Sequence, residues 1–184
     1  MMKYNTIVVD NFFDNFEALE NNFKKIPLLS FEEYPKTILN NNTSPGTGKT
    51  TWPGKRSMPL FEVNPFLCQL TIKELQQKSQ SRDLENRRWN INSVLHLRLK
   101  EDNVKDFIHT DPDDLTIIIF LGKTNLDSGI HIYNEQKEET EYIKYIQNRA
   151  VIFNSKSYHK AGTCYGNNVE NGRLTMNCFI NFQD

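Results

Sequence analysis

Two segments in the second half of the chain alternate apolar and polar residues, which is typical of strands with one buried face. They run from Trp89 to Lys100 and from Arg173 to Phe182. The polar positions of these segments are Asn90, Asn92, His96, Arg98, Arg173, Thr175 and Asn177. On the first segment, Asn92, His96 and Arg98 either lie on a solvated face or line a pocket and contact a ligand. Both interpretations stay open.

Shorter apolar runs predict the other strands of a sheet. The run from Leu115 to Leu121 is apolar almost throughout, so we expect this strand to be buried on both faces. Further strands are expected at 4–10, 129–133 and 149–153. Between 129 and 133, His131 and Tyr133 share one face. The charged segment 134–148 predicts a surface loop or a helical insertion.

Apolar residues at helical spacing predict two helices in the first half of the chain. The first runs from Asp14 to Ile26, with Asp14 as its N-cap. The second runs from Phe61 to Gln77. The residues suited to its buried face are Phe61, Phe66, Leu67, Leu70 and Leu75.

Between these helices the chain is rich in Asn, Thr, Gly and Pro from Ile38 to Met58, which predicts a loop. Ser44–Thr50 is similar to the end of a phosphate-binding loop, but Thr43 stands at the leading glycine position and no apolar strand precedes it. A flexible polar loop is therefore the better interpretation. For Trp52–Ser57, we expect a surface turn rather than a lid over a site.

Length and composition narrow the class of protein. The chain has 184 residues, twelve of them Phe, so we expect a single domain over 1–184, with the N-terminal strand, helices and loop in 1–88 and a β core in 89–184. Its 22 basic and 23 acidic residues provide no electrostatic footprint for nucleic acid. The three cysteines have neither metal-type nor redox spacing, and no leader or membrane-spanning stretch is found. We therefore expect a cytoplasmic protein.

The candidate chemistry lies in His109-Thr110-Asp111 and in His159. Alternate residues of a strand point the same way, so His109 and Asp111 can offer two ligands to one ion. His159 follows the apolar run at 150–153 and can bring a second imidazole from a later strand. Two histidines and one carboxylate form the facial triad of non-haem Fe(II) oxygenases, which leaves positions open for a co-substrate and oxygen. Zinc is the rival occupant, because the same residue types suit it.

About half of the chain, roughly 90–182, resembles the 2-oxoglutarate and Fe(II)-dependent oxygenase superfamily. The resemblance is carried by these residues together with Gly129–Tyr133, Arg149–Phe153 and Gly172–Thr175. The likeness is nearest to its prolyl-hydroxylase-like branch. It implies a fold that is mainly β with flanking helices, a double-stranded β-helix of the jelly-roll, cupin-like kind.

The same resemblance implies roles for single residues. His109, Asp111 and His159 would hold Fe(II), and Arg173 would grip the far carboxylate of 2-oxoglutarate. A guanidinium suits this task because it is always charged and forks onto a carboxylate in two parallel hydrogen bonds. The further candidates are Thr175, Arg98 and His96 for the co-substrate, and Asn92, His131 and Tyr133 for the substrate.

The implied function is that of a 2-oxoglutarate-dependent dioxygenase. It would use O2 to hydroxylate a C–H bond of an amino acid, a peptide or a small metabolite, with release of succinate and CO2. Asp111 argues against halogenation, because halogenating relatives lack the triad carboxylate. A nucleic-acid demethylase is disfavoured, because such relatives carry a second arginine shortly after the position of Arg173, which is the last arginine of this chain.

Two questions stay open at this point. Prolyl hydroxylases usually carry a Tyr before the His-x-Asp pair, where this chain has Arg98, Lys100 and Phe107, so prolyl specificity stays an open question. A non-catalytic, cupin-like metal-binding module is the alternative from a different class of protein.

Overall fold

Two antiparallel sheets form the body of the protein. The computed structural model describes residues 6–35, 52–102 and 107–183. The first sheet has six strands in the order β1 (Ile7–Val9), β7 (Arg149–Asn154), β4 (Leu115–Phe120), β9 (Arg173–Gln183), β3 (Arg88–Arg98) and β2 (Lys55–Arg56). The second has three strands in the order β6 (Glu139–Tyr145), β5 (Asn125–Tyr133) and β8 (Tyr158–Ala161).

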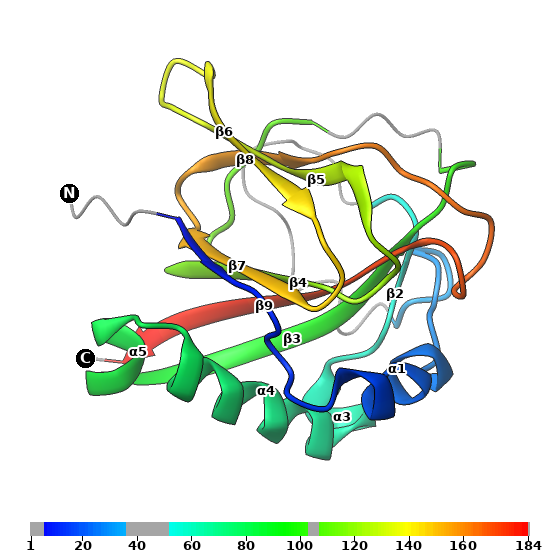
Figure 1. Cartoon of the computed structure of the whole chain (residues 1–184), viewed down its shortest axis with the longest axis horizontal. Helices are drawn as coiled ribbons and strands as arrows, with labels where there is room; N and C mark the ends of the chain where they lie inside the picture. The colour runs from blue at the N-terminus through cyan, green and yellow to red at the C-terminus, as the bar shows by residue number, and fades with distance from the viewer. Residues whose placement is uncertain (1–5, 36–51, 103–106, 184) are drawn as a thin grey trace.

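The helices all lie on one side of the six-stranded sheet, and the three-stranded sheet lies on the other (Figure 1). They are α1 (Phe16–Lys25), α3 (Leu60–Val63), α4 (Pro65–Lys78) and α5 (Arg82–Asn86). The six-stranded sheet is thus the middle layer of three, and both of its faces are covered in its central part. The prediction of a mainly β fold with flanking helices is confirmed.

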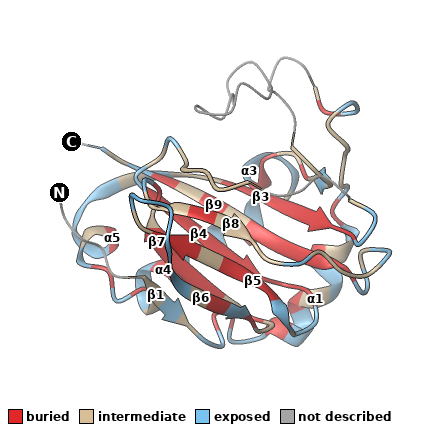
Figure 2. Ribbon diagram, turned by 90° about the horizontal axis from the view of Figure 1, so that it is seen from above, coloured by how far each residue is buried: buried red, intermediate tan, exposed pale blue. Residues whose placement is uncertain are grey.

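Because the six-stranded sheet is the middle layer, the side chains of its central strands enter two separate cores. On β4, Ile117 and Ile119 pack toward the helices, whereas Ile118 and Phe120 pack toward the small sheet. All six residues of β4 are buried, as the continuous apolar run predicts. Figure 2 shows that burial is concentrated in these central strands.

Several expected elements differ in the structure. The charged segment 134–148 is neither a loop nor a helix, because β6 within it pairs with β5 in an antiparallel hairpin. On α3 and α4, Leu67 and Leu75 are buried as expected, but Phe61 and Phe66 are exposed.

The cap of α1 also differs from the expectation. Asn15, not Asp14, precedes the helix, and its side chain makes no capping hydrogen bond. Asp14 instead pairs with Lys78 of α4. The suspected phosphate-loop sequence Ser44–Thr50 and most of the predicted loop around it fall outside the described residues. Among the residues that are described, no helix has the length and apolar character needed to cross a bilayer.

Candidate metal centre and active site

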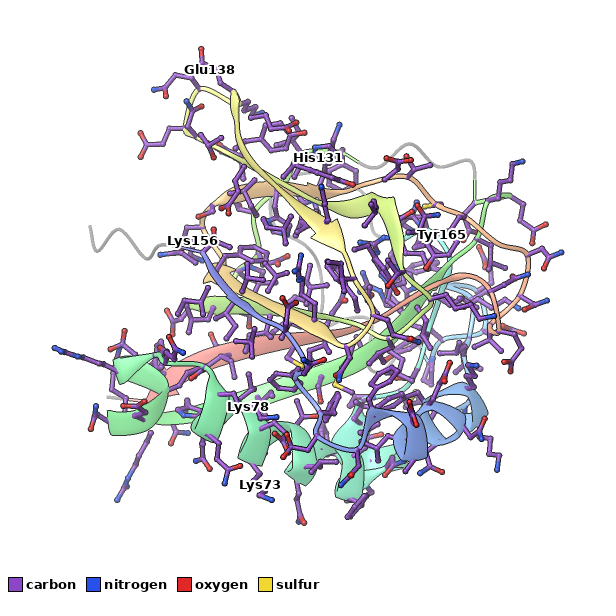
Figure 3. The ribbon with its side chains drawn as sticks, in the orientation of Figure 1. Lys73, Lys78, His131, Glu138, Lys156 and Tyr165 are labelled. Atoms are coloured by element: carbon purple, nitrogen blue, oxygen red, sulfur yellow. The ribbon has the colours of Figure 1, made fainter. Side chains whose placement is uncertain are left out.

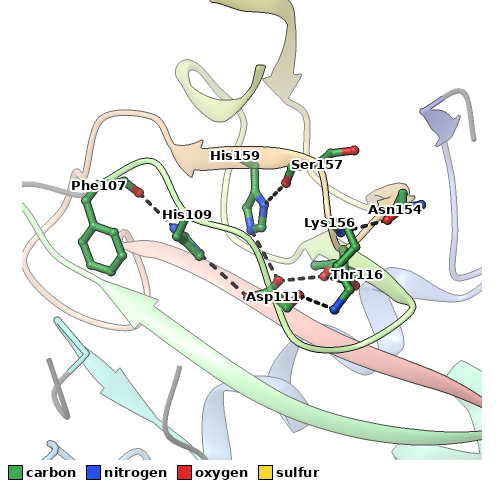
Figure 4. A network of polar contacts seen from close by, with 9 residues as sticks. Phe107, His109, Asp111, Thr116, Asn154, Lys156, Ser157 and His159 are labelled. Atoms are coloured by element: carbon green, nitrogen blue, oxygen red, sulfur yellow. Dashed lines mark hydrogen bonds and ion pairs between the residues drawn. The ribbon is translucent and has the colours of Figure 1, made fainter. Parts of the chain in front are cut away.

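The metal-site candidates meet where the two sheets face each other. His159 belongs to β8, and the segment with His109 runs alongside it, joined by backbone hydrogen bonds in both directions. The His109 imidazole, the His159 imidazole and the Asp111 carboxylate each offer a ligand atom, and these atoms lie within 4.8 Å of one another. Figure 4 shows the three side chains converging. The structure thus brings His159 together with His109 and Asp111, which lie about 50 residues earlier in the sequence.

Backbone carbonyl groups orient both imidazole rings. Nδ1 of His109 lies 2.9 Å from the carbonyl oxygen of Phe107, and Nδ1 of His159 lies 3.0 Å from that of Ser157. A carbonyl can only accept a hydrogen bond, so Nδ1 of each ring carries the proton. Each Nε2 is then left with a lone pair, which is the form of histidine that binds a metal.

Asp111 lies between the two imidazoles. Its carboxylate oxygens are 3.9 Å from Nε2 of His109 and 3.4 Å from Nε2 of His159. Thr116 donates a hydrogen bond of 2.7 Å to Oδ2 of the same carboxylate. Burial alone would raise the pKa of Asp111, but the contact with His159 in its protonated form, together with the hydrogen bond from Thr116, holds this pKa below its ordinary value. Asp111 is therefore anionic at neutral pH, as a carboxylate ligand of a metal ion has to be.

Thr116 is a member of the site that sequence reasoning missed. It lies on β4, is 2% exposed and also hydrogen-bonds to Ser155, which fixes its hydroxyl toward Asp111. The sequence does contain a signal for it, because Thr116 is the one polar residue in the apolar run from Leu115 to Leu121. Buried polar side chains in such runs are hydrogen-bonded, which often serves a site.

Arg173 enters the same cavity from the first position of β9. It is 3% exposed, and its Nε and Nη2 atoms donate to the carbonyl oxygens of Ser128 and Gly129 at 2.8 and 3.2 Å. These two bonds hold the guanidinium in place. Thr175 follows two residues later, fully buried, and donates 2.8 Å to Oδ1 of Asn177.

The cavity that joins these groups has a volume of about 130 Å³. Its apolar wall includes Phe107, Ile118, Ile130 and Phe179. His96 and Arg98 of β3 also line it, so the polar face of this strand borders a pocket rather than open solvent. Asn177, on the same face of β9 as Arg173, lines it as well.

The three residues suggested for substrate contact are not among those that line the cavity. Asn92 lies on β3 with its side-chain oxygen buried. His131 pairs with Glu139 at 2.9 Å, and Tyr133 lies below the Lys160 ammonium group. Figure 3 labels His131 on the three-stranded sheet, on the side of the molecule opposite the helices that carry Lys73 and Lys78.

The segment expected to be a surface turn belongs to the cavity instead. Lys55 and Arg56 form β2, which pairs with β3, and Trp52, Pro53 and Arg56 line the cavity. The polar composition of this segment predicts exposure, but its pairing with β3 turns Arg56 to the same face as His96.

Comparisons with solved structures agree with this architecture. A 2OG-Fe(II) oxygenase family oxidoreductase from Burkholderia pseudomallei superposes with a TM-score of 0.63 at 12% identity, covering 96% of this chain and 84% of that chain. The viral collagen prolyl hydroxylase of Paramecium Bursaria Chlorella virus-1 does so with a TM-score of 0.53 at 14% identity, covering 98% and 91%. The chain has the fold of the 2-oxoglutarate and Fe(II)-dependent oxygenases. The predicted double-stranded β-helix is thereby confirmed.

A third similar structure is the prolyl hydroxylase of Trichoplax adhaerens in complex with a hypoxia inducible factor peptide fragment. It has a TM-score of 0.57 at 10% identity and covers 95% of this chain and 82% of that chain. No protein-family profile and no curated protein sequence matches the chain. The likeness is therefore one of fold, and the activity has to be argued from the site itself.

Proposed function

We propose that this protein is an Fe(II)- and 2-oxoglutarate-dependent dioxygenase that hydroxylates a C–H bond of a small molecule or peptide and releases succinate and CO2. The observation that carries the proposal is that the His109, Asp111 and His159 side chains share one cavity with the guanidinium of Arg173. A metal site and a carboxylate anchor so close together suit a co-substrate that binds at both ends.

The three side chains fit a ferrous ion. Two imidazole nitrogens and one carboxylate are the ligand set of the facial triad. Nitrogen and oxygen ligands lie about 2.0–2.2 Å from such metals, so neighbouring ligand atoms are about 3 Å apart. The Asp111 oxygens lie 3.4 and 3.9 Å from the imidazole Nε2 atoms. Small side-chain rotations would reduce these separations to about 3 Å.

The bound metal and 2-oxoglutarate would supply the activation of O2, and the protein would supply position and environment. Arg173 would bind the far carboxylate of 2-oxoglutarate, because its guanidinium lines the cavity and two backbone carbonyls hold it in position. Ile118, Ile130 and Phe179 would keep bulk water from the reacting atoms. Thr116 would hold the Asp111 carboxylate in its ligating orientation.

Arg173 also separates this proposal from its two rivals. A hydrolytic zinc site has no evident use for a buried carboxylate anchor beside the metal. A binding module with a structural metal has no use for such an anchor either, because protein ligands fill every position around a structural metal. The triad described here supplies three ligands and leaves the remaining positions open.

The test is anaerobic titration of the purified protein with Fe(II) and 2-oxoglutarate. We expect a metal-to-ligand charge-transfer absorption band that requires both additions, and succinate release once O2 is admitted. The His109→Ala variant should lose both signals, whereas His131→Ala should keep both, because His131 lies outside the cavity. A wild-type protein without the band, or a His109→Ala variant that retains it, would overturn the proposal.

A further inference from the structure

Asn177 of β9 occupies a position between the proposed co-substrate anchor and the proposed metal site. Because a strand has a two-residue period, Arg173, Asn177 and Phe179 lie on one face of β9, and all three line the cavity. In the strand register, Phe179 lies opposite Thr116, the residue that donates a hydrogen bond to Asp111. One end of this row of side chains is therefore at the anchor, and the other end is beside a metal ligand.

Asn177 is closer to the metal end of this row than to the anchor. An antiparallel strand rises about 3.4 Å per residue, so the Cα atom of Asn177 is about 7 Å from that of Phe179 and about 14 Å from that of Arg173. A 2-oxoglutarate molecule that meets Arg173 with one carboxylate and the metal with its other end lies along the same row. Asn177 then faces the end that carries the 1-carboxylate and the 2-oxo group.

Thr175 fixes the orientation of the Asn177 carboxamide. The Thr175 hydroxyl is fully buried and donates a hydrogen bond of 2.8 Å to Oδ1 of Asn177. The other acceptor near this hydroxyl, the carbonyl oxygen of His96, is 3.4 Å away. A hydroxyl has one proton to donate, and the shorter contact takes it. Oδ1 of Asn177 is thus engaged by Thr175, and Nδ2 is the part of the carboxamide that is left for another partner.

Within the part of the chain that the structure describes, Nδ2 of Asn177 has no acceptor. The residues opposite Asn177 on the neighbouring strands are Val94 of β3 and Ile118 of β4, and both are apolar and buried. Asn177 itself is half-buried in the wall of the cavity. An amide in apolar surroundings gains free energy from a hydrogen-bond partner, and a carboxylate is a strong acceptor. The position therefore suits a bound acid.

We propose that Nδ2 of Asn177 donates a hydrogen bond to the 1-carboxylate of 2-oxoglutarate, so that protein side chains hold the co-substrate at both ends. This inference rests on the proposed function, because it requires 2-oxoglutarate between Arg173 and the metal ligands. Arg173 binds the far carboxylate, Asn177 orients the near one, and Thr175 keeps the carboxamide in its donating orientation. The hydrogen bond fixes the direction in which the 2-oxo acid end of the molecule approaches the metal.

The first experiment measures co-substrate binding without turnover. Anaerobic titration of the Fe(II)-loaded protein with 2-oxoglutarate, followed by the charge-transfer band, yields the Kd of the co-substrate. Asn177→Asp keeps the size of the side chain and the acceptor for Thr175, but it replaces the donor nitrogen by a charged oxygen. We expect this Kd to rise by about tenfold or more. Asn90→Asp is the matched control, because it adds the same charge at an exposed position of β3 outside the cavity, and its Kd should stay within about twofold of wild type.

The second experiment removes the donor without adding charge. Asn177→Leu deletes both polar atoms at similar volume, and it should also raise the Kd for 2-oxoglutarate, by about fivefold or more. The maximum of the charge-transfer band should move to shorter wavelength, because a hydrogen bond to the 2-oxo acid end lowers the energy of the orbital that accepts the electron. Arg173→Lys acts on the far carboxylate, so it should weaken binding and leave the maximum in place. Fe(II) affinity in the absence of 2-oxoglutarate should be retained in Asn177→Leu.

Three results would overturn the inference. The first is unchanged affinity for 2-oxoglutarate in both Asn177 variants. The second is a parallel loss of Fe(II) affinity in Asn177→Leu, which would indicate a structural role for the side chain. The third is weaker binding of 2-oxoglutarate with an unmoved band, which would remove Asn177 from the 1-carboxylate. Absence of the charge-transfer band in wild type would be a different result, because it refutes the proposed function itself.

Discussion

His109 and His159 donate backbone hydrogen bonds to each other, with N–O distances of 3.0 Å from His109 to His159 and 2.8 Å in the other direction. Their ring centroids are 4.3 Å apart. The pair forms a short antiparallel bridge at the end of β8, so the two imidazoles leave the backbone on the same side. Backbone pairing therefore establishes the distance between these two candidate ligands before any metal binds.

Removal of the Thr116 hydroxyl should weaken metal binding without breaking the fold. Thr116→Val keeps the shape of the side chain but deletes the 2.7 Å hydrogen bond to Asp111. Loss of a partner that orients a ligand typically costs about 10–100-fold in metal affinity. Anaerobic Fe(II) titration measures the effect. Thr140→Val is the control, because its hydroxyl bonds to a backbone carbonyl of β5, and unchanged affinity in Thr116→Val would contradict the assigned role.

Replacement of Arg173 by Lys should separate co-substrate binding from metal binding. Lysine keeps the charge but lacks the planar fork, and it cannot reproduce both hydrogen bonds to Ser128 and Gly129. We expect the KM for 2-oxoglutarate to rise by about tenfold or more, with Fe(II) affinity retained. Arg149→Lys alters a surface ion pair with Asp10 and should leave the KM unchanged. A parallel loss of Fe(II) affinity in Arg173→Lys would point to a structural role instead.

Asn148 should be a stability determinant remote from the chemistry. Its buried side chain accepts from the Phe13 N–H and donates to the Phe13 carbonyl, both at 2.9 Å, and its φ of 62° is left-handed. Asn148→Ala removes both bonds and adds backbone strain, so we expect a loss of about 2–4 kcal/mol in the free energy of unfolding by urea. Asn148→Gly removes the bonds alone and should lose about 1–2 kcal/mol less. Equal losses would show that the backbone conformation contributes nothing.

Stability should fall as the pH drops below about 6.5, partly because of His96. Its pKa is held well below the unfolded value of 6.5, so the unfolded chain takes up a proton that the folded protein does not. This contribution to the free energy of unfolding is therefore retained well above pH 6.5 and is lost as the pH falls through that value, with a slope that approaches about 1.4 kcal/mol per pH unit. Urea unfolding of metal-free protein at about pH 7.5 and 5.5 measures this.

His96→Gln has no titrating group at this position, so it should lose less stability between the two pH values than wild type. His131→Gln is the control, because His131 is paired with Glu139 outside the cavity and its removal should leave the His96 contribution intact. An identical pH dependence in wild type and His96→Gln would contradict the buried, neutral state of His96.

Local features of the sequence were sufficient for much of the core. A strand has a two-residue period, so the alternation in β3 and β9 reveals which residues share a face wherever the strands end up. For the same reason His109 and Asp111 could be assigned to one ion, and the apolar run of β4 could be expected to lie between two layers. These predictions depend on covalent geometry alone.

Other features depend on which strands meet, and only the tertiary structure decides that. The charged segment 134–148 forms β6 because β5 supplies backbone partners for it, and Arg56 lines the cavity because β2 pairs with β3. Phe61 and Phe66 are exposed because α3 and α4 use other faces against the sheet. Strand pairing determines the first two outcomes and helix packing determines the third, and no local pattern encodes either.

Some features of the candidate site likewise follow from the sequence, and others only from the tertiary structure. The sequence by itself determined the ligand types and the carboxylate anchor, because histidine, aspartate and arginine carry their chemistry in their side chains. The tertiary structure decided which imidazole nitrogen of each ring faces a backbone carbonyl, that Thr116 holds Asp111, and that Arg56 lines the same cavity. These properties arise from contacts between segments far apart in the chain, so they exist only once the two sheets have packed together.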